Sequence, residues 1–159
     1  MDLKKVLTAV PVDQWRTQQV IVFDWHDGPR EGLCSLANPQ AEFFFALLDE
    51  RHNPDGLDDR LFRIREVSPG TVARTIKELR DLGAPDSVVW VPVWRFPNVA
   101  NAQRAERFLE ELRTKAAPLS VVIASRDLER FQGCWDAGTV NQPASDWFSS
   151  LSIPMNPGV

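Results

Sequence analysis

Several residue types that support common chemistries are missing or scarce in this sequence. Tyrosine is absent, and cysteine and histidine occur only twice each in 159 residues. Without tyrosine no phenol can act as an acid or base, and two cysteines cannot build a disulfide-rich scaffold. Two histidines leave little material for a catalytic triad or a zinc centre, and no Cys-x-x-Cys or His-x₃-His pair is present.

Long apolar runs and an excess of basic charge are also missing. No run of about 18 apolar residues occurs, so the sequence predicts no membrane span. The chain carries 22 acidic and 18 basic side chains, a formal charge of −4, which argues against nucleic acid as a partner. No apolar leader pattern follows Met1, which favours a cytoplasmic protein. The glycine motifs that bind phosphates and the Gly-x-Ser-x-Gly elbow are absent, so no cofactor is expected.

The residues that are present describe an ordinary globular chain, 43% apolar and 25% charged. A chain of this length buries roughly 68–70% of the surface that its unfolded form exposes. It can therefore fold as one domain without a disulfide or a metal. Six tryptophans are its most unusual feature.

The first half of the sequence predicts a short helix followed by a meander of strands. Residues 3–9 suit the helix, and residues 18–26 suit a strand that runs into the turn signal Asp27-Gly28. Residues 31–36 are the expected return strand. The segment 41–48 contains three consecutive phenylalanines and favours a third strand, with a helix as the alternative because so short an apolar run has no diagnostic period.

The second half alternates predicted strands and helices. Residues 49–59 hold five carboxylates and are interpreted as a solvated loop whose acids pair with neighbouring arginines such as Arg60. Ser68 and Pro69 suit the N-cap and first position of a helix that Gly83 ends. The other predicted elements are a strand over 61–67, a strand over 87–94, a helix over 98–116, a strand over 119–125 and a short helix over 127–133.

This order predicts an α+β fold with a single mixed β-sheet. An N-terminal antiparallel meander is followed by a β-α-β-α-β half, with right-handed crossovers and helices packed against the sheet. Residues 1–142 are expected to form this single domain. Residues 143–159 form an apolar, proline-containing tail that is expected to pack on the domain, because a solvated tail has no use for large apolar groups such as Trp147 and Ile153.

The densest cluster of acid–base groups is Asp24, His26 and Glu31, at the ends of two strands of the meander. Asp24 and His26 share a face if the strand is regular, and Glu31 begins its partner strand. They are the candidate catalytic residues, with the histidine as base and a carboxylate orienting it. Asp24, His26 and His52 are the candidate metal ligands. The alternative is that these are hydrophilic residues at a hairpin end.

A second candidate site combines aromatic and cationic side chains. Trp90, Trp94 and Arg95 follow one another at the end of a predicted strand, and Trp25 lies at the first hairpin. Such a surface suits a peptide or a ring-bearing ligand whose polar end an arginine holds. The alternative is that the tryptophans belong to the core, which is their usual place.

We therefore expect a small, non-catalytic cytosolic domain that binds a protein partner or small ligand through Trp25, Trp90, Trp94 and Arg95. One alternative is a metal-assisted hydrolase that uses the Asp24, His26 and Glu31 cluster. Another is a structural subunit that forms a homodimer through its C-terminal tail. Neither nucleic acid nor a membrane is an expected partner.

Overall fold

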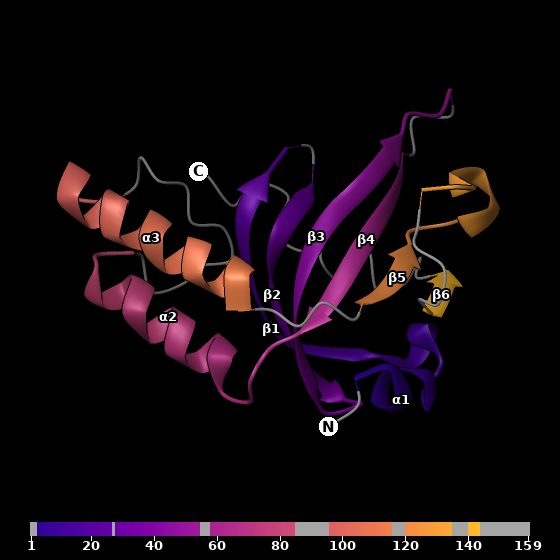
Figure 1. Cartoon of the computed structure of the whole chain (residues 1–159), viewed down its shortest axis with the longest axis horizontal. Coiled ribbons are helices and arrows are strands. Elements are labelled where there is room, and N and C mark those ends of the chain that lie inside the picture. The colour runs from indigo at the N-terminus through magenta and orange to yellow at the C-terminus, as the bar shows by residue number, and fades with distance from the viewer. Residues whose placement is uncertain are drawn as a thin grey trace.

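The protein is an α+β fold built on a sheet whose strands follow one another in chain order (Figure 1). The computed structural model describes residues 3–26, 28–54, 58–84, 96–115, 120–134 and 140–143. The sheet has the order β1-β2-β3-β4-β5-β6, and every neighbouring pair from β1 to β5 is antiparallel. The short β6 pairs with β5 in parallel. The predicted α+β class is thus confirmed.

The strands are β1 (Arg16–Trp25), β2 (Pro29–Asn38), β3 (Ala41–Arg51), β4 (Asp59–Glu66), β5 (Ser120–Ala124) and β6 (Val140–Pro143). The helices are α1 (Leu3–Thr8), the 3₁₀ turn η1 (Val12–Gln14), α2 (Thr71–Asp81), α3 (Val99–Lys115) and the 3₁₀ turn η3 (Leu128–Phe131). The strand predicted over 41–48 is confirmed and is longer than expected. The segment 49–59 is not all loop, because β3 continues to Arg51 and pairs there with Asp59.

Both faces of the sheet are covered, which explains the nearly continuous apolar runs in β2 and β3. On one face Phe43, Phe45 and Phe62 form the centre of the largest core cluster, with Trp15 and the α1 residue Leu7 packed over them. On the other face Phe44 belongs to a cluster with α2 residues. Burial of a side chain of this size contributes about 1.5–3 kcal/mol. Successive phenylalanines of β3 therefore anchor opposite layers.

Helices α2 and α3 lie side by side on one face of the sheet (Figure 1). The predicted inward residues of α2, such as Val72 and Leu79, are buried, and so are Ala105 and Leu109 of α3. The apolar spacing of both helices predicted these contacts correctly. The chain leaves the sheet along α2 and returns along α3.

The start of α2 differs from the prediction. The helix begins at Thr71, not at Pro69, and its N-cap Gly70 has φ +84° and offers no side chain. The carboxylate of Glu42, from β3, accepts hydrogen bonds from the backbone N–H groups of Gly70 and Val72 at 2.5 and 2.9 Å. A negative charge is favourable at a helix N-terminus. A residue of the sheet therefore performs the capping that Ser68 was expected to perform.

The β-α-β-α-β prediction is wrong in one respect that the structure describes. Strands β4 and β5 are neighbours and antiparallel, whereas two successive crossovers would leave them parallel. Helices α2 and α3, which separate these two strands in sequence, lie on the same face of the sheet (Figure 1). The predicted strand over 87–94 lies outside the described residues.

The predicted C-terminal boundary of the domain, residue 142, lies in the last described strand and stays a prediction. That strand, β6, ends at Pro143. The remaining tail, 144–159, lies outside the described residues. Among the helices of the described part of the chain, none combines the length and the apolar character that crossing a membrane requires.

The middle of β2 fits tightly between its neighbours. A Cβ placed on Gly32 would lie 2.1 Å from the carbonyl oxygen of Ile21 and 2.7 Å from the Cζ of Phe45. The first contact is with backbone and cannot be relieved by a side-chain rotation. Glycine at this position leaves room for the backbone of β1 and for the ring of Phe45 from β3.

Candidate functional site

The predicted catalytic cluster is only partly assembled by the structure. Asp24 and Glu31 are opposite each other in the pairing of β1 and β2. The carboxylate of Glu31, however, is engaged by Arg113 of α3, which donates from Nη2 and Nε at 2.5 and 2.9 Å. This two-point pairing raises the pKa of Arg113 above its ordinary value, chiefly through the hydrogen bond to Glu31. Glu31 therefore joins α3 to the sheet.

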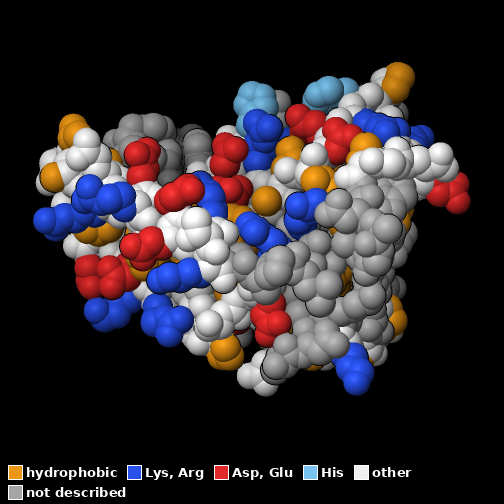
Figure 2. Space-filling view, viewed as in Figure 1, with side chains coloured by type: hydrophobic (Ala, Val, Ile, Leu, Met, Phe, Trp, Pro, Cys, Tyr) orange, Lys and Arg blue, Asp and Glu red, His pale blue; other side chains and the backbone are white. Residues whose placement is uncertain are grey.

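The other members of the predicted cluster lie at an exposed edge. Asp24 is exposed, and its carboxylate lies 4.0 Å from the guanidinium of Arg30. His26 follows β1, where bulges interrupt the alternation, and His52 lies beside Asp58 with 3.0 Å between Nδ1 and Oδ2. Histidine side chains lie at one rim of the molecule among acidic and basic groups (Figure 2). Within the described residues, no three His, Cys, Asp or Glu side chains gather closely enough to hold a metal ion.

The predicted aromatic surface is described only at Trp25. This side chain is partly buried and packs against the core cluster of Phe43 and Phe45. Trp90, Trp94 and Arg95 lie outside the described residues. The involvement of these four residues in binding stays a prediction.

A buried charge network at the end of the β3–β4 hairpin was not predicted. Asp59 is fully buried, and its carboxylate accepts hydrogen bonds from Arg126, Arg130 and Asn53 at 2.6, 2.8 and 3.1 Å. Burial alone would raise the pKa of Asp59, but these three hydrogen bonds outweigh burial and hold the pKa below its ordinary value. The prediction of a solvated acidic loop is wrong for this residue.

Arg60 is the largest fully buried side chain of the described structure. Its guanidinium donates to the backbone oxygens of His26 and Pro29 at 2.8 and 3.2 Å and lies 3.5 Å from a carboxylate oxygen of Glu50. The expected pairing of Arg60 with an acid of the preceding segment, residues 49–59, is thus confirmed. One buried cation ties the β1–β2 turn to β3 and β4, so we interpret this network as structural.

Neither Cys34 nor Cys134 forms a disulfide. Cys34 is buried in β2, whereas Cys134 follows η3 with its Sγ 3.0 Å from an oxygen of Asp49. The hydrogen bond to Asp49 and burial raise the pKa of the Cys134 thiol. The carboxylate of Asp49 therefore disfavours the reactive thiolate of Cys134.

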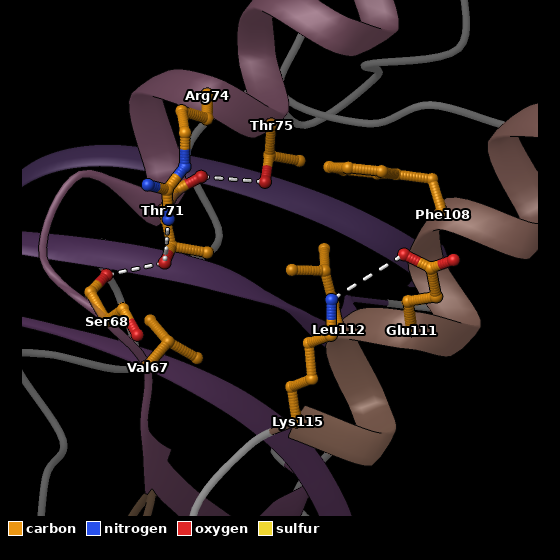
Figure 3. Close-up of a pocket in the computed structure, with 9 residues that line it drawn as sticks. All are labelled: Val67, Ser68, Thr71, Arg74, Thr75, Phe108, Glu111, Leu112 and Lys115. Atoms are coloured by element: carbon orange, nitrogen blue, oxygen red, sulfur yellow. Dashed lines mark hydrogen bonds and ion pairs between the residues drawn. The ribbon is translucent and has the colours of Figure 1, made fainter.

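A cavity of about 250 Å³ lies between α2 and α3 (Figure 3). Two segments of the chain line it, the first turns of α2 with the residues just before them and the last turns of α3. The lining residues are Val67, Ser68, Thr71, Arg74, Thr75, Phe108, Glu111, Leu112 and Lys115. Phe108 projects from α3 toward Thr75, and the Lys115 ammonium reaches back to Glu111 (Figure 3).

Some hydrogen-bond donors of this cavity already have partners in the protein, and others do not. The hydroxyls of Thr71 and Thr75 donate to backbone oxygens of their own helix. Arg74 uses one N–H on Thr71, at 3.2 Å, and a guanidinium has five donors. Lys115 lies 3.8 Å from Glu111 in an exposed pair, which is weak. Two cations against one carboxylate leave a formal charge of +1 on the lining.

Sequence reasoning missed this cavity. Its helical residues follow the same spacing as the rest of α2 and α3, and only the packing of the two helices places Arg74 and Phe108 around one cavity. The one available signal was that Thr71 and Thr75 give the inner face of α2 two hydroxyls among its apolar positions. The chain matches no known protein family, no curated protein and no solved structure.

Proposed function

We propose that this protein is a non-catalytic binding module that holds a small anionic, ring-bearing ligand in the cavity between α2 and α3. As in the sequence-based expectation, an aromatic ring and a cation hold the ligand. The ring is now that of Phe108, and the cations are Arg74 and Lys115. The observation that carries the proposal is the approach of Arg74, Lys115 and Phe108 to one cavity.

The size and the lining of the cavity define the ligand. A dry cavity of about 150 Å³ admits benzene, so about 250 Å³ has room for one ring with a charged substituent. Val67 and Leu112 offer apolar contact to the ring, and Phe108 offers an aromatic face or edge. The guanidinium of Arg74 matches the planar geometry of a carboxylate or phosphate.

Binding of benzoate and phenyl phosphate to the full chain tests the proposal. We expect both probes to shift the amide ¹H–¹⁵N resonances of residues 71–75 and 108–115. A hydrogen bond to a charged group contributes about 1.5–3 kcal/mol, so Arg74→Ala is expected to weaken binding by about tenfold or more. The variant should fold normally, because Arg74 is exposed.

Two controls isolate the charge and the site. Benzyl alcohol keeps the ring without the anion and should bind more weakly than benzoate. Arg104→Ala removes an exposed arginine of α3 that is not part of the cavity lining, and it should leave affinity unchanged. Absence of shifts at about 10 mM probe, ten times a Kd of 1 mM, or equal losses in both variants, contradicts the proposal.

A further inference from the structure

The cavity between α2 and α3 has a buried floor and an exposed, charged rim. The floor residues are Val67, Thr71 and Thr75, and the rim residues are Arg74, Glu111 and Lys115. The methyl group of Thr75 points toward the ring of Phe108 (Figure 3). A ring-bearing anion therefore enters with its ring toward the floor and keeps its charged group at the rim.

Glu111 is the only acid among the described residues that line this cavity. Its carboxylate lies 3.8 Å from the Lys115 ammonium, which is too long for a normal hydrogen bond. The two side chains are 66% and 76% exposed, so solvent screens their attraction. The three N–H groups of the ammonium can therefore turn to an anion at the rim. Any anion that Lys115 binds also lies close to Glu111.

The charge of the rim determines which anion matches the cavity. Arg74, Lys115 and Glu111 sum to a formal charge of +1, so a bound carboxylate makes the occupied cavity neutral. A phosphate monoester carries a charge of about −1.5 to −2 at pH 7 and leaves an excess of negative charge beside Glu111. Like charges repel, and a doubly charged group also loses more hydration when it binds.

We propose that Glu111 selects the charge of the ligand, so that the cavity binds aromatic carboxylates in preference to aromatic phosphate monoesters. This inference rests on the proposed function, because it requires an anion in the cavity. The carboxylate lies between Arg74 and Lys115, and Glu111 repels a second negative charge at the same place. Glu111 therefore determines specificity without a favourable contact of its own with the ligand.

The affinities of benzoate and phenyl phosphate for the full chain at pH 7, measured from amide ¹H–¹⁵N shifts, test this selectivity. We expect the wild type to bind benzoate more tightly. Glu111→Gln removes the charge and keeps the shape, so both ligands should bind the variant more tightly. Coulomb's law in water gives about a two- to sixfold gain per unit of ligand charge for groups about 4–8 Å apart. Phenyl phosphate should gain nearly the square of the factor for benzoate, so the preference for benzoate should shrink or reverse.

Glu110→Gln is the matched control variant. Glu110 is also 66% exposed and also pairs with a cation of α3, Arg113, but it is not part of the cavity lining. This variant should leave the ratio of the two affinities unchanged. Phenyl methyl phosphate, a diester with a single negative charge, separates charge from the geometry of phosphate. Glu111→Gln should tighten its binding by the same factor as that of benzoate.

The possible outcomes distinguish this inference from the proposed function. Tighter binding of phenyl phosphate than of benzoate by the wild type overturns the inference. So does an affinity ratio that Glu111→Gln leaves unchanged, or that Glu110→Gln changes by as much. Absence of binding by both ligands contradicts the proposed function, and the inference fails with it. Binding of both ligands without the expected selectivity contradicts the inference alone.

Discussion

The two ends of the sheet differ in whether their polar side chains have hydrogen-bond or ion-pair partners within the protein. At the β3–β4 hairpin end, Asp59 and Arg60 are buried and their charged groups are satisfied by other parts of the chain. At the end where α2 begins, Ser35 has a buried hydroxyl without a described partner. Arg74 uses one of its five N–H groups in a hydrogen bond to Thr71. Buried groups that satisfy one another hold the fold together. Polar groups that line a cavity and have no partner in the protein can instead bind a ligand.

The largest expected effect tests the structural end of this comparison. Arg60→Met keeps much of the side-chain volume but leaves Glu50 and two backbone oxygens without their cation. Removing one partner of a buried ion pair costs about 3–5 kcal/mol, and urea denaturation should report a loss of that size. Arg30→Met on the adjacent hairpin, whose ion pair with Asp24 is exposed and long, should cost less than about 1 kcal/mol. Similar losses in the two variants would show that Arg60 is not special.

Asp59→Asn should have the next largest effect, about 2 kcal/mol at pH 7, because it weakens hydrogen bonds to Arg126 and Arg130. The pKa of Asp59 is lowered in the folded protein, so its contribution is present above the unfolded value of about 3.9 and is lost as pH falls through the folded pKa. The gap between wild type and variant, measured by urea denaturation, should therefore narrow below about pH 4.

The control for Asp59 is its neighbour. Asp58 pairs with the exposed His52, so Asp58→Asn should change stability at pH 7 by less than about 1 kcal/mol. A gap for Asp59→Asn that stays constant from pH 7 down to about pH 2, well below the unfolded value, would contradict the assigned role of its charge.

The smallest expected effect compares two buried serines directly. The hydroxyl of Ser125 accepts a hydrogen bond from the backbone N–H of Arg60 at 2.8 Å, whereas that of Ser35 has no described partner. Ser125→Ala should cost about 1 kcal/mol or slightly more, and Ser35→Ala should cost nothing. Urea denaturation of both variants under one condition measures the contrast. Equal losses would remove the distinction between the two ends of the sheet.

Patterns of short period in the sequence were enough to predict much of the fold. The meander and the inner faces of α2 and α3 follow from the spacing of apolar residues. The start of α2 could not be predicted, because Glu42, almost thirty residues earlier, competes with Ser68 for the capping role. The partners of Asp59 could not be predicted either, because Arg126 lies 67 residues away.

The candidate sites show the same limit more strongly. Asp24, His26 and Glu31 are close in sequence, yet Arg113 of a distant helix engages Glu31. The cavity between α2 and α3 joins side chains from distant segments whose local patterns are unremarkable. Closeness in sequence therefore suggested a catalytic site at Glu31, whereas the structure uses this residue to join α3 to the sheet.

Gly32 has a consequence for how relatives of this chain could be recognised. Because the carbonyl oxygen of Ile21 stands where a Cβ would be, no compensating change at another side chain makes room for alanine. We expect the ring at position 45 to vary among relatives, while position 32 stays glycine wherever the strand register is kept. An alanine at 32 in a protein with the same register would refute this diagnostic fingerprint.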